Sequence, residues 1–171
     1  GTNIGSELAA TAAPDGYTLF MGGASNAINM TLYAKPPYNT ARDFAAVVWC
    51  VQGAALLAAH PSLPAKNAKE LIALAKARPG AVNFASAGAG TTTHMSGELF
   101  AYMAGVRMTH IPYKGSAPSL VSVVGGEVTL SFASTSAVPL VASGRLALLA
   151  VTGSKRSAQF PKTPTVAESG L

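Results

Sequence analysis

Residues 82–95 read V-N-F-A-S-A-G-A-G-T-T-T-H-M, in which a short apolar run leads through small residues into a segment of good helix formers. The pattern predicts a strand over residues 82–85 and a helix over residues 92–103. Backbone N–H groups at a helix start have no intrahelical partner and carry the positive end of the helix dipole. The stretch therefore predicts a place where a carboxylate or phosphate could bind.

The loop inside this stretch allows two interpretations. Gly88 and Gly90 permit positive φ and close approach of a ligand to the backbone. Four hydroxyls could add donors, namely those of Ser86, Thr91, Thr92 and Thr93. The same hydroxyls could instead only cap the helix, and the local sequence does not separate the two readings. The Gly-Lys-Ser/Thr ending of a nucleotide-binding P-loop is absent.

The rest of the chain predicts an α/β fold. Strands are expected over residues 108–112, 128–132 and 146–151, and helices over 117–124 and 137–142. Regular alternation of strands and helices indicates a mostly parallel sheet flanked by helices on both faces. Earlier segments predict a strand at 17–21, helices at 27–33 and 67–77, and two strands within 44–59 separated at Gln52-Gly53.

Ligands of such folds sit beyond the carboxyl ends of the strands. The loops that follow strands span residues 22–26, 86–93, 113–116 and 133–136, so these four loops are predicted to share one cleft.

Composition excludes several classes of protein. The chain has 171 residues, 49% apolar and 11% charged, which is enough apolar content for a packed core. No apolar run reaches the roughly 18 residues of a membrane span, so the chain is not expected to be membrane-embedded. The net charge of +5 comes from scattered residues, which argues against nucleic acid as a partner. The first residues do not resemble a signal peptide, so any export signal is expected to have been removed.

The sequence predicts no catalytic residues, no metal site and no cofactor. None of the seven acidic residues falls in the four loops, and the G-x-S-x-G nucleophile motif is absent. His60, His94 and His110 lack the spacing of a zinc motif. His110 is expected to be structural within its strand, whereas His94 could contact a ligand or serve the core. Cys50 lies in an apolar run and is expected to be a buried thiol.

Six stretches carry a family resemblance. They are A-A-P-D-G-Y-T-L-F-M-G (12–22), H-P-S-L-P-A-K (60–66), N-F-A-S-A-G-A-G-T-T-T-H-M-S-G-E-L-F (83–100), I-P-Y-K-G-S-A-P (111–118), L-A-V-T-G-S-K-R-S (149–157) and P-T-V-A-E-S-G (164–170). Together they resemble the Bug-type receptors, which are the extracytoplasmic solute-binding proteins of tripartite tricarboxylate transporters. The resemblance runs through the whole chain in family order.

The resemblance implies a type II-like periplasmic binding protein fold with two lobes. Residues 1–56 would form part of a first, incomplete lobe, residues 57–152 the second lobe, and residues 153–171 a return segment to the first. It also implies a periplasmic receptor that holds a small carboxylate between its lobes and presents it to a membrane permease. The residues expected to bind the ligand are Gly23, Ala24, Ser25, Asn26, Ser86, Ala87, Gly88, Ala89, Gly90, Thr91, Thr92, Thr93, His94, Ala133 and Ser134.

One departure from the family bears on the ligand. Ala133 stands where the family often has an aspartate that could pair with an ammonium group. We therefore expect a ligand without an amino group, such as a di- or tricarboxylate or an aromatic acid. Two other functions stay open: an interaction module that forms a homodimer through the incomplete lobe, and an enzyme acting on small carboxylates.

Overall fold

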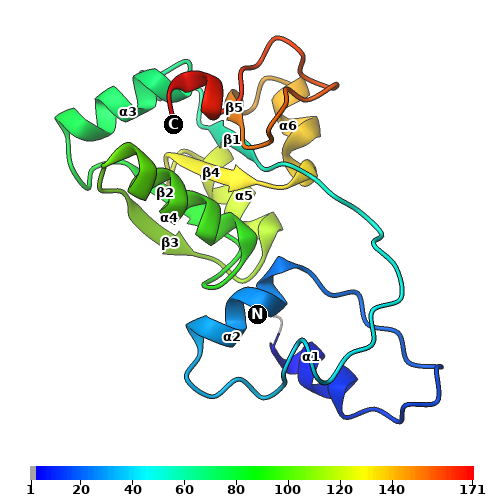
Figure 1. The fold of residues 1–171 in the computed structure, drawn as a ribbon. Coiled ribbons are helices and arrows are strands. Elements are labelled where there is room, and N and C mark those ends of the chain that lie inside the picture. Colours follow the sequence, from blue (N-terminus) through cyan, green and yellow to red (C-terminus); the bar gives the residue numbers. More distant parts are fainter. Residues whose placement is uncertain (1–2) are drawn as a thin grey trace.

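The computed structural model describes residues 3–171, in which residues 56–151 build a five-stranded sheet flanked by helices, with the helices of residues 3–32 to one side of it (Figure 1). The strands are β1 (Leu56–Ala59), β2 (Asn83–Ser86), β3 (Thr109–Pro112), β4 (Leu130–Ala133) and β5 (Ala147–Val151), in the spatial order β3-β2-β4-β1-β5. Strand β2 pairs in parallel with β3 and β4, whereas β1 is antiparallel to β4 and β5. Four strands thus share one direction, which confirms a mostly parallel sheet, with β1 as the exception.

The helices are α1 (Asn3–Ala10), α2 (Ala24–Leu32), α3 (Ala68–Ala77), α4 (Thr92–Ala104), α5 (Ser116–Val124) and α6 (Val138–Ala142), with short 3₁₀ turns η1 (Thr135–Ala137) and η2 (Ala167–Ser169). Sequence signals explain several ends. The Asn67 side chain accepts a hydrogen bond from the Glu70 N–H and so caps α3. Gly105 ends α4 at φ 61°, in the left-handed region. None of the described helices is both long and apolar enough to cross a membrane.

Helices cover both faces of the sheet, which gives three layers. On one face, α3 and α4 pack on the strands, and Phe100 contacts Phe132, with Phe84 beside it. On the other face, α5 and α6 pack on the strands, and Val123 lies in the same apolar cluster as Ala85. One apolar cluster therefore lies on each face of the sheet, and packing on both faces fixes the positions of the strand ends.

Residues 3–55 contain α1 and α2 but no strand. The strands predicted at 17–21 and in the first part of 44–59 are wrong, because within residues 3–171 no neighbouring strand pairs with these segments. A strand needs such a partner for its backbone groups. The apolar side chains there are exposed, with Tyr17 at 93% and Trp49 at 80%. Cys50 is exposed as well, so its predicted burial is also wrong.

The chain enters and leaves the sheet at one point. Since β1 is antiparallel to β5, Ala55 before β1 lies beside Thr152 after β5. The Ala55 N–H donates to Thr152 Oγ1, and the Thr152 N–H donates to the Ala55 carbonyl, both at 2.9 Å. Residues after Thr152 fold back onto β5, where the Val166 N–H donates to the Val151 carbonyl. A division into lobes at these crossings stays a prediction.

Candidate functional site

Three of the four predicted loops meet at the carboxyl ends of β2, β3 and β4. Because these strands are parallel, their last residues lie at one edge of the sheet, where a narrow cleft of about 10 Å³ has room for about one water molecule. The cleft is lined by Ala87, Thr93, Ser116, Ser119, Leu120, Ser131, Ala133, Ser134 and Ser136. The structure thus brings Ala133 and Ser134 next to the loop of residues 86–93, which we call the anion loop.

Two glycines shape the anion loop. Gly88 has φ 129°, and a Cβ there would lie 3.2 Å from the Tyr113 carbonyl oxygen. Gly90 has φ 76°, and its Cβ would lie 2.7 Å from Asn29 Oδ1 and 2.8 Å from Leu32 Cδ2. Both positions favour glycine for conformation and for space. Gly90 also brings the loop into direct contact with α2.

Three of the loop hydroxyls hold the loop itself. Thr91 is the N-cap of α4: its Oγ1 accepts from the His94 N–H and donates to the Gly88 carbonyl at 2.6 Å. Thr93 Oγ1 accepts from the Ala87 N–H at 2.9 Å. Ser86 Oγ accepts from the Gly88 N–H at 3.1 Å. The capping interpretation is therefore confirmed for Thr91, and these hydroxyls serve the shape of the loop.

The donors left over are backbone groups. In the part of the chain that the structure describes, the N–H groups of Ala89, Thr92 and Thr93 have no hydrogen-bond partner. Those of Thr92 and Thr93 belong to the first turn of α4, where the helix dipole adds positive potential. The anion cradle predicted from the sequence is thus reduced to three backbone donors.

The loop of residues 22–26 lines a different cavity, of about 410 Å³, between the starts of α1 and α2. Its lining residues are Gly5, Phe20, Met21, Gly22, Gly23, Ser25 and Asn26. Asn26 is buried, its Oδ1 accepts from the Gly23 N–H at 2.8 Å, and its Nδ2 donates to Ser6 Oγ at 2.7 Å. Asn26 therefore ties α2 to α1. The structure does not bring this loop into the cleft of the anion loop; Ala24 begins α2 and lines neither cavity.

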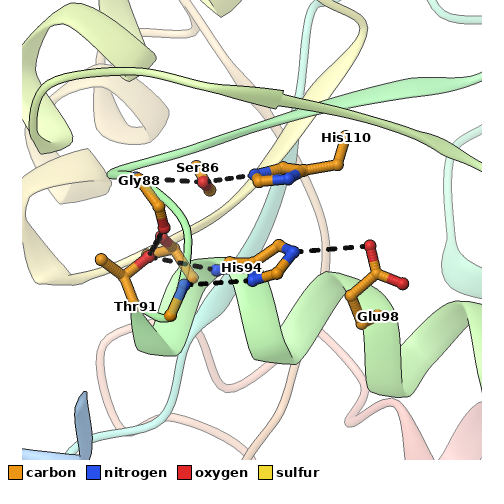
Figure 2. Close-up of polar contacts among 8 residues, drawn as sticks. Ser86, Gly88, Thr91, His94, Glu98 and His110 are labelled. Carbon is orange, nitrogen blue, oxygen red and sulfur yellow. Dashed lines mark hydrogen bonds and ion pairs between the residues drawn. The ribbon is translucent and has the colours of Figure 1, made fainter. Parts of the chain in front are cut away.

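Two stacked histidines adjoin the anion loop (Figure 2). The rings of His94 on α4 and His110 on β3 lie 4.0 Å apart between centroids with 29° between their planes, and His110 also stacks on Phe84 at 4.9 Å. His94 Nδ1 accepts from the Gly90 N–H at 3.3 Å, and His110 Nε2 lies 2.6 Å from Ser86 Oγ. Burial, and secondly the charge of His94, lower the pKa of His110 to about 4.

Sequence reasoning missed the contact of His110 with the site. Its partners are 24 residues away at Ser86 and 16 residues away at His94, in other elements. The register of β2 against β3, which pairs Phe84 with His110, would have revealed it. Register between parallel strands is not readable from a single sequence.

His94, Glu98 and His110 offer three possible metal ligand atoms within 4.8 Å of one another. Their arrangement does not fit a metal ion. His94 Nδ1 accepts a hydrogen bond, so the neutral ring carries its proton on Nε2, which faces Glu98 at 3.6 Å. Metal-binding lone pairs lie in the ring planes and must converge on one point about 2.0–2.1 Å from each nitrogen, whereas stacked rings direct theirs along nearly parallel planes. The cluster is therefore a stacked pair of rings, each hydrogen-bonded to the anion loop.

Comparison with known proteins shows the family of the chain. The profile of the tripartite tricarboxylate transporter family receptor matches residues 1–171. Protein BugT of Bordetella pertussis is 38% identical over 170 residues, which cover 98% of this chain and 52% of BugT. The chain thus spans about half the length of this curated relative.

Solved structures agree over nearly the whole chain. R. palustris Rpa4515 with adipate has a TM-score of 0.94 and 36% identity, covering 99% of this chain and 57% of that one. MatC from Rhodopseudomonas palustris with bound malate has a TM-score of 0.90 and 29% identity, covering 99% of this chain and 58% of that one. The fold is that of periplasmic binding proteins, over somewhat more than half of their length.

Proposed function

Because this chain belongs to the receptor family of tripartite tricarboxylate transporters, we propose that it forms the carboxylate-holding part of an extracytoplasmic solute receptor. Members of this family are solute-binding receptors and not enzymes. The N–H groups of Ala89, Thr92 and Thr93 carry the function, since backbone donors at a helix start suit a carboxylate. Each charge-assisted hydrogen bond contributes about 1.5–3 kcal/mol.

The ligand is a small carboxylate without an amino group. Ala133 lines the cleft beside the anion loop and offers a methyl group where an ammonium would need a counter-charge. The Ser134 and Ser136 hydroxyls line the same cleft and bond each other at 2.9 Å, and they offer acceptors and a donor to a polar group of a ligand that lies over this narrow cleft. Dicarboxylates of the kind bound by the adipate and malate proteins meet these requirements.

Binding closes residues 3–55 onto the sheet, with hinges near Gln52-Gly53 and at residues 151–153. The contact of Gly90 with Asn29 and Leu32 supports this mechanism, because it places α2 against the loop that would hold the ligand. Residues 22–26 at the start of α2 would then contribute from the opposite side of the ligand. The loaded receptor would deliver the carboxylate to a membrane permease from the periplasm.

A calorimetric titration of the 171-residue chain tests this function. Adipate, malate, citrate and benzoate form one arm and aspartate and glutamate the other, all at pH 7.5. Binding of one carboxylate class, with aspartate and glutamate weaker, supports the assignment. Tight binding of aspartate would contradict the role given to Ala133. If no ligand of either arm gave a heat of binding, the carboxylate-binding function of the anion loop would be contradicted.

A second candidate function is self-association. Residues 17–21 and 47–51 expose apolar side chains, with Leu19 and Met21 at 79% and Trp49 at 80%. Clusters of exposed large apolar side chains mark interaction sites, so a second copy of the chain could cover these segments. Sedimentation velocity at two protein concentrations distinguishes a dimer from a monomer, and a concentration-independent monomer would exclude this candidate.

A further inference from the structure

The anion loop makes two hydrogen bonds with histidine rings. The Gly90 N–H donates to His94 Nδ1, and the Gly88 N–H donates to Ser86 Oγ, which in turn contacts His110 Nε2 at 2.6 Å. Figure 2 shows the path from Gly88 through Ser86 to His110, and the hydrogen bonds at the His94 ring beside it. Each ring is thereby connected to one of the two loop glycines.

The hydrogen-bond pattern requires an uncharged His94. A ring nitrogen accepts an N–H only with a free lone pair, so Nδ1 of His94 carries no proton while Gly90 donates to it. Protonation there would set two N–H donors against each other at 3.3 Å. Glu98 is the carboxylate in contact with this ring. Its side chain is 52% exposed, so the carboxylate is in contact with both water and the His94 ring.

The stack requires an uncharged His110 as well. Its ring lies between Phe84, on β2, and His94, so a proton on His110 would lose part of its hydration and lie close to a second imidazole. Ser86 is fully buried and polar but uncharged, and Phe132 on β4 packs edge-on against Phe84. Of the acidic side chains in residues 3–171, only Glu98 joins this cluster.

We propose that His94 and His110 are positioning residues of the anion loop. As neutral stacked rings, they hold the N–H groups of Gly88 and Gly90 within the protein, which leaves those of Ala89, Thr92 and Thr93 for the ligand. Loss of either contact frees a glycine at positive φ to reorient, and the free donors of the same loop and helix start shift with it. This inference rests on the proposed function of the loop as a carboxylate site.

Amide side chains provide a test at each ring nitrogen. In His94→Asn, the amide oxygen can accept the Gly90 N–H in place of Nδ1, whereas His94→Leu keeps the bulk and loses the acceptor. In His110→Gln, the amide group reaches the position of Nε2 beside Ser86, whereas His110→Leu does not restore that bond. His60→Gln is the matched histidine control, because the hydrogen bonds given for the His60 ring stay within its own turn, to Ser62.

We expect His94→Asn and His110→Gln to bind the best carboxylate within about threefold of the parent at pH 7.5. Both leucine variants should bind about tenfold more weakly, which corresponds to one hydrogen bond fewer between the loop N–H groups and the charged ligand. The parent should lose affinity as pH falls from 7 to about 4, the pKa of His110, relative to the double variant His94→Asn/His110→Gln at the same pH. Comparison at equal pH removes the titration of the ligand. Leucine variants that bind like the parent, or equal pH profiles, would overturn the proposal.

A second measurement needs no ligand. Long-range ¹H–¹⁵N NMR spectra of the parent at pH 7.5 should show His94 with its proton on Nε2 and both rings neutral, and the Gly90 amide should shift in His94→Leu but hardly in His94→Asn. A charged ring, a proton on Nδ1 of His94, or a zinc-induced change of both rings would contradict the positioning role. If no carboxylate bound but the NMR spectra showed the expected neutral rings and Gly90 shifts, only the carboxylate-binding function would be contradicted.

Discussion

The ring of Phe84 lies directly over the α-carbon of Gly97. An added Cβ on Gly97 would overlap the ring, with Phe84 Cδ2 and Cζ both at 2.7 Å. This contact brings α4 close to β2, so the first turn of α4 and the end of β2 together fix the anion loop. Glycine in a helix interior lowers helix propensity, but at position 97 it allows α4 to pack close to β2.

Gly97→Ala is expected to destabilise the protein by about 1–3 kcal/mol, because the fully buried Phe84 ring cannot move away without disturbing the core. Urea denaturation measures the change. Gly5→Ala is the matched control: it is also helical, and a Cβ there meets nothing within 4 Å. That variant should gain up to about 1 kcal/mol from helix propensity. Equal effects at the two positions would refute the packing role of Gly97.

Gly90→Ala should cost both stability and ligand affinity. The new methyl group combines an unfavourable positive φ with contacts to Asn29 and Leu32. Gly80→Ala has a similar φ of 81° with nothing within 4 Å, and should show only the conformational cost of about 1–2 kcal/mol. The difference between the two variants in urea denaturation isolates the contact with α2. A larger loss for Gly80→Ala would contradict that contact.

Thr92→Pro should weaken carboxylate binding about 10- to 100-fold with little loss of helix stability. Proline is accepted at the first position of a helix, and Thr91 already has the extended backbone (φ −81°, ψ 161°) that a following proline needs. The substitution deletes one free N–H, worth one charge-assisted hydrogen bond. Thr92→Ala keeps the N–H and should bind like the parent. Calorimetry and far-UV circular dichroism together report affinity and helix content.

The free energy of unfolding should fall as pH drops from about 6.5 to about 4. The lowered pKa of His110, about 4, means that the unfolded chain binds this proton first as pH falls, so acid favours unfolding across that window. Since the ring is partly exposed, we expect a total effect of about 1–2 kcal/mol. Urea denaturation at pH 7, 5.5 and 4.5 tests this, and His110→Gln should flatten part of the slope. An unchanged slope in that variant would assign the effect to other groups.

Glu168 should hold the last residues of the chain through charge. The Arg156 guanidinium, and secondly the Thr165 N–H, lower the pKa of Glu168. The interactions of the Glu168 carboxylate are therefore fully present above the ordinary pKa of a glutamate and are lost only as pH falls through the lowered pKa. Glu168→Ala should speed hydrogen exchange at Thr165 and Val166, while Glu168→Gln, which still accepts from Thr165, should show a smaller change. High salt should reduce the difference between parent and Glu168→Gln.

How far the sequence predicts this molecule depends on whether local or distant contacts decide. The strand and helix around Gly88 and Gly90 were predictable, because small residues, a capping threonine and helix formers lie next to one another. The segments at 17–21 and 44–55 were not, since an apolar pattern becomes a strand only beside a partner. The role of His110 was hidden in the register of β3 against β2.

The same limit applies inside the site. The sequence does not indicate which of the four hydroxyls of the anion loop form hydrogen bonds within the loop. This depends on the turn geometry that places Thr93 Oγ1 against the Ala87 N–H. The buried position of Asn26 likewise depends on α1, whose Ser6 lies 20 residues away.

The paired residues Ala55 and Thr152 have a mechanical consequence. Residues 3–55 join the sheet covalently at this one place, and they touch it again where Gly90 contacts α2. In the proposed closure, the chain would bend at the first place and open or close the contact at the second. Such a movement would separate α2 from the anion loop without breaking a hydrogen bond between strands, and it would break the contacts at Gly90.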